Sequence, residues 1–323
     1  MNSVAANALF SALMLFTGSA IGQTYPAKVV KVLVGFPPGG GSDVVARMMS
    51  ERLGERFRQP FVVENRLGAN GVIAMQAVIS SPSDGYTLMV TTSGSLTVSP
   101  LLQKNMPHDP VTSFTPVALA VAFPFILFAR PDFPASDVKG LVQYARGNPG
   151  KLSYGSPGIG SSNHLGGEWF KSLNKIEMTH VPYKGDAAAM TDIIAGRLDI
   201  AFGPAILALP QVKTGKIKSL AATSSMRTRF AQGIPTMIES GTPDFIIEPW
   251  NGLVGPAGLP RDIVVRLNQA VNEELGRDDI QTRLTEMNLY SITDTPEGFR
   301  RRIEQQLAHW SGVIKQARIQ AVE

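Results

Sequence analysis

The chain contains no cysteine among its 323 residues. Disulfide bonds, catalytic thiols and thiolate metal sites are therefore excluded, and so is a lipid anchor on an N-terminal cysteine. Beyond the N-terminal segment, no apolar run reaches the ~18 residues that a membrane-spanning helix requires. We therefore expect the mature protein to be freely soluble.

Charge is sparse and nearly balanced, with 30 basic and 26 acidic residues and a net charge of +4. The longest basic run is the short segment Arg300–Arg302, which falls in a predicted helix and is typical of a solvated helix face. These features argue against a nucleic-acid partner. The small positive excess still favours the collection of anionic ligands.

Motifs for catalysis and cofactor binding are missing as well. Neither the nucleophile motif Gly-x-Ser-x-Gly nor the phosphate-loop motif Gly-x-x-x-x-Gly-Lys occurs, and Gly158 with Gly160 supplies only part of a dinucleotide fingerprint. Ser161 and His164 leave a hydrolase as an alternative, although His164 fits a helix-start residue that donates to a ligand or to the backbone. We predict a protein that is not an enzyme and binds no metal and no cofactor. No metal-ligand spacing relates the four histidines, His108, His164, His180 and His309.

The N-terminus predicts export. Residues 8–20 form a mostly apolar stretch, and Ala20 and Gly22 place small residues where a signal peptidase cleaves. No Lys or Arg precedes Lys28, so the positive end of the signal rests on the α-amino group alone. An uncleaved anchor and an unexported chain are the alternatives. We predict a cleavable signal peptide over residues 1–22 and a periplasmic mature protein.

The N-terminal third alternates between strand and helix patterns. A β-branched apolar run over residues 28–36 is broken by the Pro-Pro-Gly-Gly-Gly segment 37–41, and an amphipathic helix follows. Further strands are predicted over 61–64 and 86–91, with a helix between them. This β-α-β-α-β order is typical of a parallel sheet in an α/β lobe.

A second set of alternating elements follows a long apolar segment, residues 117–130, which Pro124 interrupts. The chain is predicted to return over residues 245–255 and to end in two amphipathic helices. This order predicts an α/β protein of two lobes, joined by a hinge of two crossover strands, with the ligand between the lobes. The predicted lobes are residues 23–124 with 248–323 for lobe 1, and 125–247 for lobe 2.

Two glycine-rich loops share one design, in which a loop follows a strand and opens a helix. Glycines let the backbone approach a ligand closely, and a helix start supplies unpaired N–H donors with a partial positive charge. One such loop in each lobe predicts a clamp for a carboxylate without a buried Arg or Lys. Ordinary strand-to-helix turns are the alternative, and Asp43 is expected to cap its helix or brace its loop. The candidate ligand-binding residues in these loops are Phe36, Pro38, Gly39, Gly40, Gly41, Ser42, Asp43, Ser156, Gly158, Gly160, Ser161, Ser162, Asn163 and His164.

Other candidates stand at the ends of predicted strands. Ser93 follows the strand that ends at Thr92, where a parallel sheet usually presents ligand contacts. Tyr183 ends a short strand and either lines the cleft or belongs to a plain turn. Trp250, near the return crossing, either walls the cleft or packs in the core.

Several short segments jointly resemble the Bug family of periplasmic solute-binding proteins, the receptor component of tripartite tricarboxylate transporters. Each segment is weak alone, but together they follow the family order from about Tyr25 to the C-terminus. The matching segments are Phe-Pro-Pro-Gly-Gly-Gly-Ser-Asp at 36–43, and those at 63–66, 84–88, 160–165, 180–185, 215–218 and 256–258.

The resemblance implies a periplasmic-binding-protein fold of type II, in which two lobes close around a ligand like a Venus flytrap. It implies that Gly39–Ser42 and Ser156–His164 bind a ligand carboxylate, partly through ordered waters. The implied partners are the large and small integral-membrane subunits of a tripartite transporter, or a sensor protein where the receptor serves signalling. We therefore predict a monomeric receptor that captures a small carboxylate for uptake, with a ligand-sensing module as the main alternative.

One departure from the family pattern concerns the ligand. Phe202, Gly203 and Pro204 stand where many relatives carry Asp-Asn after the phenylalanine, and that polar pair lies near the ligand in the family. Its loss predicts a less polar or bulkier ligand. Phe202 and Gly203 therefore join the candidate site.

Overall fold

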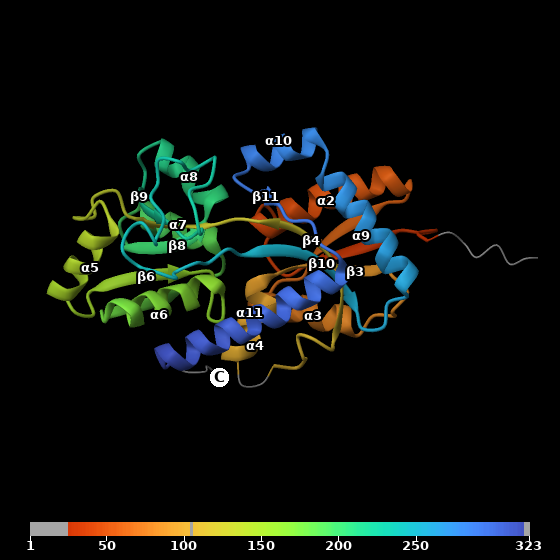
Figure 1. Cartoon of the computed structure of the whole chain (residues 1–323), viewed down its shortest axis with the longest axis horizontal. Coiled ribbons are helices and arrows are strands. Elements are labelled where there is room, and N and C mark those ends of the chain that lie inside the picture. The colour runs from red at the N-terminus through yellow and green to blue at the C-terminus, as the bar shows by residue number, and fades with distance from the viewer. Residues whose placement is uncertain (1–24, 104–105, 320–323) are drawn as a thin grey trace, which may run out of the picture.

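The computed structural model describes residues 25–103 and 106–319, so the predicted signal peptide over residues 1–22 lies outside the described residues. Two β-sheets lie along the long axis of the molecule, each covered by helices (Figure 1). This arrangement confirms the predicted two-lobed α/β fold. Within the described residues, no helix combines the length and the hydropathy needed to cross a membrane.

The first sheet has six strands in the order β11-β4-β10-β3-β1-β2. β1 pairs in parallel with both β2 and β3, which confirms the parallel β-α-β-α-β start. The strands added later, β10 and β11, run antiparallel to their partners. The strands are β1 (Val30–Val34), β2 (Phe61–Asn65), β3 (Thr87–Thr92), β4 (Phe114–Ala122), β10 (Trp250–Pro256) and β11 (Tyr290–Ser291).

The second sheet has five strands in the order β7-β6-β8-β5-β9. Its centre is parallel, because β6 pairs in parallel with β7 and β8, whereas β5 runs antiparallel to β8 and β9. The strands are β5 (Phe125–Ala129), β6 (Leu152–Ser156), β7 (Met178–Pro182), β8 (Ile200–Pro204) and β9 (Lys218–Ala222).

Helices follow most of the strands and cover both faces of the sheets (Figure 1). The helices of the first sheet are α2 (Gly41–Phe57), η1 (Ala69–Gly71), α3 (Val72–Ile79), η2 (Gly94–Val98), α4 (Ser99–Leu102), α9 (Arg261–Leu275), α10 (Asp278–Glu286) and α11 (Pro296–Ala317). Those of the second sheet are α5 (Val138–Gly147), α6 (Ser162–Asn174), α7 (Asp186–Ile194) and α8 (Ala205–Lys213). The helices η2, α4, α8 and α10 were not predicted, and α10 makes the C-terminal end of the chain three helices where two were expected.

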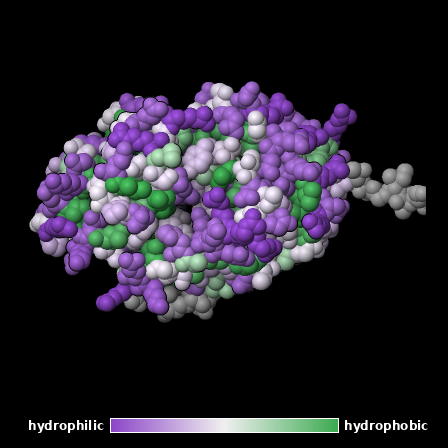
Figure 2. Space-filling view, viewed as in Figure 1, coloured by the Kyte–Doolittle hydropathy of each residue, from purple (hydrophilic) through white to green (hydrophobic). Residues whose placement is uncertain are grey.

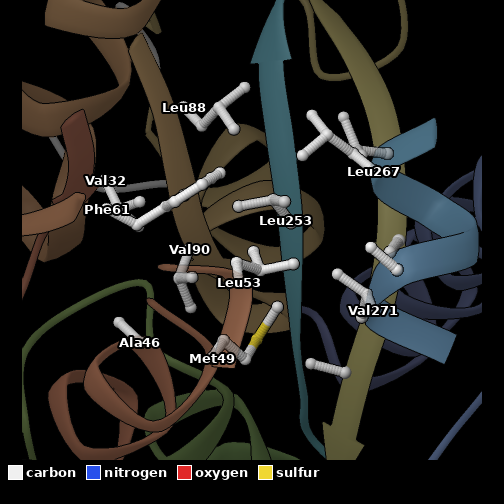
Figure 3. Close-up of a cluster of buried hydrophobic side chains, with 14 of the residues drawn as sticks. Val32, Ala46, Met49, Leu53, Phe61, Leu88, Val90, Leu253, Leu267 and Val271 are labelled. Carbon is white, nitrogen blue, oxygen red and sulfur yellow. The ribbon is translucent and has the colours of Figure 1, made fainter. Parts of the chain in front are cut away.

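One core explains why α2 and α9 take their places. Their apolar stripes meet the sheet face that carries Val32, Leu88 and Leu253 (Figure 3). Leu53 of α2 and Leu267 of α9 are both essentially buried there. Burial of each such side chain contributes about 1.5–3 kcal/mol, so the amphipathic pattern read from the sequence is sufficient to dock these helices.

The chain crosses between the sheets twice. It leaves through Phe123 and Pro124, between β4 and β5, and returns through residues 245–249 before β10. The Phe123 N–H donates to the Pro249 carbonyl at 3.1 Å, so the two crossings are tied to each other. This pair of connections is the geometry that a hinge requires.

Helix α11 links the two lobes. Thr295 caps its start by accepting a hydrogen bond from the Gly298 N–H at 3.0 Å. Its first turns bury Phe299 in the core beneath the first sheet, whereas Trp310 joins the core of the second sheet. The apolar side chains of this amphipathic helix are therefore divided between two cores, and α11 runs along the molecule from one lobe to the other (Figure 1).

Candidate functional site

A cavity of about 410 Å³ lies between the lobes. Its wall combines loops of both sheets with Phe123 and Pro249 of the two crossings. A space of this size suits a small organic molecule. The outer surface in the view of Figure 2 is mostly hydrophilic, with apolar residues in small groups.

The first glycine-rich loop forms one side of the cavity. It turns where the Gly40 N–H donates to the Pro37 carbonyl at 3.2 Å, and Gly39 has φ +78°, a conformation that favours glycine. Gly40 takes the N-cap position of α2 without a side-chain cap. The first N–H groups of α2 therefore remain available to an anion in the cavity.

Asp43 lies beneath this loop and not in the cavity wall. Its carboxylate accepts hydrogen bonds from the Gly39 N–H at 2.9 Å, from Arg47 Nε at 2.9 Å and from Asn65 Nδ2 at 2.8 Å. Burial alone would raise the pKa of Asp43, but the hydrogen bonds from Arg47, Gly39 and Asn65 hold it below its usual range. Asn65 also donates to the Phe36 carbonyl, so strand β2 fixes both ends of the loop.

The second glycine-rich loop faces the first across the cavity. Ser161 caps α6 by accepting from the His164 N–H at 3.1 Å, and its hydroxyl donates to the Gly158 carbonyl at 2.7 Å. Asn163 extends its amide into a polar corner, where Nδ2 donates to the Phe202 carbonyl at 2.6 Å and to Asp186 Oδ1 at 3.0 Å. The start of α6 thus presents its donors to the same space as the start of α2.

A buried polar cluster supports the second loop from behind. Ser156 Oγ lies 2.7 Å from His180 Nε2, and the rings of His180 and His164 lie 4.3 Å apart. Burial lowers the pKa of both histidines, to about 4 for His180, so both are neutral near pH 7. Ser156 is buried outside the wall of the cavity. This serine–histidine pair therefore braces the loop from behind. In the pair that the sequence left as a hydrolase alternative, the Ser161 hydroxyl donates to the Gly158 carbonyl and accepts from the His164 backbone N–H, not from the His164 ring.

The structure divides the predicted site residues into two groups. Those in the cavity wall are Phe36, Pro38, Gly39, Gly40, Gly41, Ser42, Ser93, Ser161, Ser162 and Asn163. Those behind the wall are Asp43, Ser156, Gly158, Gly160, His164, Tyr183, Phe202 and Gly203.

Long-range contacts explain why several candidates lie behind the wall. The Tyr183 hydroxyl donates to Asp192 Oδ2 at 2.8 Å, which turns the ring away from the cavity. Gly203 packs against the ring of Phe128, and it is the next residue, Pro204, that reaches the cavity. Trp250 packs on Phe299 in the core, with ring centroids 5.1 Å apart.

Sequence reasoning missed other residues of the wall, among them Asn70 and Asp186. Asn70 Nδ2 donates to Ser99 Oγ at 2.7 Å and to the Gly160 carbonyl at 3.1 Å, so it joins the first lobe to the second loop. In the sequence, Asn70 is marked only by its place between Gly68 and Gly71. In the structure, its backbone is left-handed, with φ 52°. Asp186, which follows Gly185 at the start of α7, belongs to no motif that marks a ligand site.

The wall is nearly free of charged side chains. Among the described residues that line it, only Lys184 and Asp186 are charged. The starts of α2, α6 and α8 contribute neutral residues to the wall, and their N–H groups supply positive potential there, whereas the start of α7 carries Asp186. No group of three or more His, Cys, Asp or Glu residues is placed to hold a metal ion in the described parts of the chain.

Comparisons with known proteins agree with this geometry. The model of the tripartite tricarboxylate transporter family receptor matches residues 45–319. Protein BugT of Bordetella pertussis is 32% identical over 297 residues, which cover 91% of this chain and 90% of BugT.

Two solved structures share the fold. Rpa4515 of R. palustris, solved with adipate, has a TM-score of 0.89 and 34% identity, and the match covers 92% of this chain and all of that one (100%). MatC of Rhodopseudomonas palustris, solved with malate, has a TM-score of 0.85 and 31% identity over 90% of this chain and 100% of its own. The expected resemblance to the Bug family is confirmed, and the chain belongs to the tripartite tricarboxylate transporter receptor family.

Proposed function

We propose that this protein is a periplasmic receptor that captures a small carboxylate between its lobes and presents it to the membrane subunits of a tripartite transporter. The observation that carries the proposal is the convergence of three helix starts, those of α2, α6 and α8, with two glycine-rich loops, on one cavity. Such N–H groups stabilise an anion without a buried cation, which suits a receptor that must also release its ligand. Adipate in Rpa4515 and malate in MatC support a carboxylate as the ligand class.

The proposal assigns direct ligand contacts to the predicted residues that line the cavity and a supporting role to those behind it. In this proposal, one lobe consists of residues 23–124 with 248–323 and the other of residues 125–247, and the two lobes close on the ligand. Residues 1–22 are removed on export. The family is one of solute-binding receptors, and the described residues that line the cavity include no nucleophile bonded to a histidine ring. A monomer is sufficient for this role.

A thermal-shift screen tests the proposal. The mature protein is unfolded and refolded to remove carried-over ligand, and is then mixed with di- and tricarboxylates, amino acids and aromatic monocarboxylates. A ligand at ~100 times its dissociation constant adds about 2.7 kcal/mol to stability and raises the melting midpoint by several degrees. A flat response of folded protein to every carboxylate would reject the proposal.

The two loop serines give a sharper prediction. Ser42 Oγ already accepts from Asn251 Nδ2 at 3.0 Å, which leaves its hydroxyl hydrogen for a ligand, and Ser162 stands at the start of α6. We expect Ser42→Ala combined with Ser162→Ala to weaken carboxylate binding at least about 100-fold in titration calorimetry, at about 1.5–3 kcal/mol per lost bond. Ser311→Ala on the exposed face of α11 is the control. An unchanged dissociation constant would place the ligand elsewhere.

A further inference from the structure

Asp186 sets one part of the cavity apart from the rest. It is the first residue of α7, and it lines the cavity on the side of the second sheet. Its Oδ1 accepts from Asn163 Nδ2 at 3.0 Å, and the second bond of that amide, to the Phe202 carbonyl, fixes its direction. No ion pair within residues 25–103 and 106–319 involves Asp186. Among the side chains of those residues only Asn163 is bonded to the carboxylate, at Oδ1, so Oδ2 can meet a ligand.

The surroundings of Asp186 make its charge costly. Burial raises the pKa of Asp186 to about 7, and the hydrogen bonds from Asn163 and from its own backbone offset this effect only in part. No charged side chain contributes to the shift. The N–H groups at the start of α7 compensate the charge of this half-buried carboxylate in part, and a proton or a cation that arrives from outside would compensate it further.

The charged groups nearby do not provide that cation. Lys184 lines the same cavity but is exposed, so water solvates its ammonium group. On α7 itself, Asp192 is already engaged by Tyr183 and Arg197. Across the cavity, Asp43 is paired with Arg47 beneath the first loop. The remaining wall around Asp186 is neutral, with Asn163 from α6 and Pro204 from β8.

The cavity therefore has two ends of opposite character. The α2 start, on the first sheet, offers N–H donors with no side-chain cap and favours a negative group. The α7 start, on the second sheet, already carries its own negative group in Asp186 and favours a positive one. A ligand that spans the lobes would meet both ends at once.

We propose that Asp186 makes this receptor selective for carboxylates that also carry an ammonium group, with the ammonium nitrogen paired to the Asp186 carboxylate and the ligand carboxylate held at the start of α2. The inference rests on the proposed function, because it names the ligand class of the same cavity. The competing arrangement is a protonated Asp186 that donates a hydrogen bond to a second carboxylate of a ligand without an amine.

Matched ligand pairs that differ only in the amine separate these arrangements. Titration calorimetry would compare glutamate with glutarate, aspartate with succinate and phenylalanine with 3-phenylpropionate at pH 8, where most of Asp186 is ionised. For whichever pair binds, we expect the ligand with the amine to have a dissociation constant at least about tenfold lower, because it alone can pair with Asp186. Asp186→Asn, which keeps the acceptor for Asn163, should remove that preference. The exposed Asp262→Asn changes net charge equally and should preserve it.

The pH dependence of the wild type provides an independent test. Only ionised Asp186 binds an ammonium group, so the affinity for the amino ligand should rise about tenfold from pH 6 to pH 8. The competing arrangement requires the protonated form and predicts the opposite slope for the ligand without an amine. Tighter binding of the unsubstituted carboxylate, with proton uptake, would overturn the inference and leave the proposed function intact. If no carboxylate of either kind binds, the proposed function fails and the inference falls with it.

Discussion

Asp43→Ala is expected to abolish tight carboxylate binding although Asp43 does not line the cavity. Its side chain is 2% exposed and holds the first loop through Gly39 and Asn65. Without it, these buried donors lose their acceptor, and the loop loses the position that directs its N–H groups at the ligand. We expect the free energy of unfolding to fall by about 2–4 kcal/mol, at about 1–3 kcal/mol for each unsatisfied group. Arg47 is half-exposed and can be solvated, so it adds little.

Urea denaturation and titration calorimetry measure the two effects. Asp43→Asn is the matched variant, because it keeps the shape and one acceptor but loses the charge, and it should give an intermediate loss. The lowered pKa of Asp43 also fixes the sign of a pH effect. Its stabilisation is complete above the unfolded value near 3.9 and is lost as pH falls through the lower folded pKa. The stability difference between the wild type and Asp43→Asn should therefore shrink below about pH 4. Ligand binding unchanged in Asp43→Ala would show that the loop does not need this support.

Trp310→Ala is expected to lower the free energy of unfolding by about 3–5 kcal/mol, the usual cost of removing a buried tryptophan. Trp310 is 4% exposed and meets the edge of Trp169, with ring centroids 5.9 Å apart. Trp169 in turn stacks on Phe245 at 4.7 Å, beside the return crossing. The substitution therefore loosens the contact by which α11, anchored on the first lobe at Phe299, is attached to the core of the second.

Denaturant unfolding followed by circular dichroism gives the change in free energy. Gln316→Ala, on the exposed face of the same helix, is the control and should stay within about 0.5 kcal/mol of the wild type. A loss for Trp310→Ala as small as that of the control would mean that the second half of α11 is not part of the core. Such a result would also contradict the division of the α11 stripe between two lobes.

The sequence alone determined most of the local elements and the family. Strands and helices follow from periods of about two and 3.6 residues, and these periods depend only on which side chains are apolar. The two glycine-rich loops were visible because a positive φ, as at Gly39 and Gly160, favours glycine. The two crossings were visible because an apolar run is interrupted at Pro124 and recurs after Phe245. Together with the short family segments, these signals predicted a two-lobed receptor.

Only the tertiary structure decided which loop residues face the ligand. Asp43 is drawn beneath its loop by Asn65, and Tyr183 is turned away by Asp192, through hydrogen bonds that no local period reveals. Asp186 gains its importance from enclosure and from the Asn163 amide, which the packing of α6 on β8 brings within reach. Side-chain direction in a loop is set by partners distant in sequence, so a motif can locate a site but not orient it. The division of α11 between two cores has the same cause, because one apolar stripe does not specify how many partners it will meet.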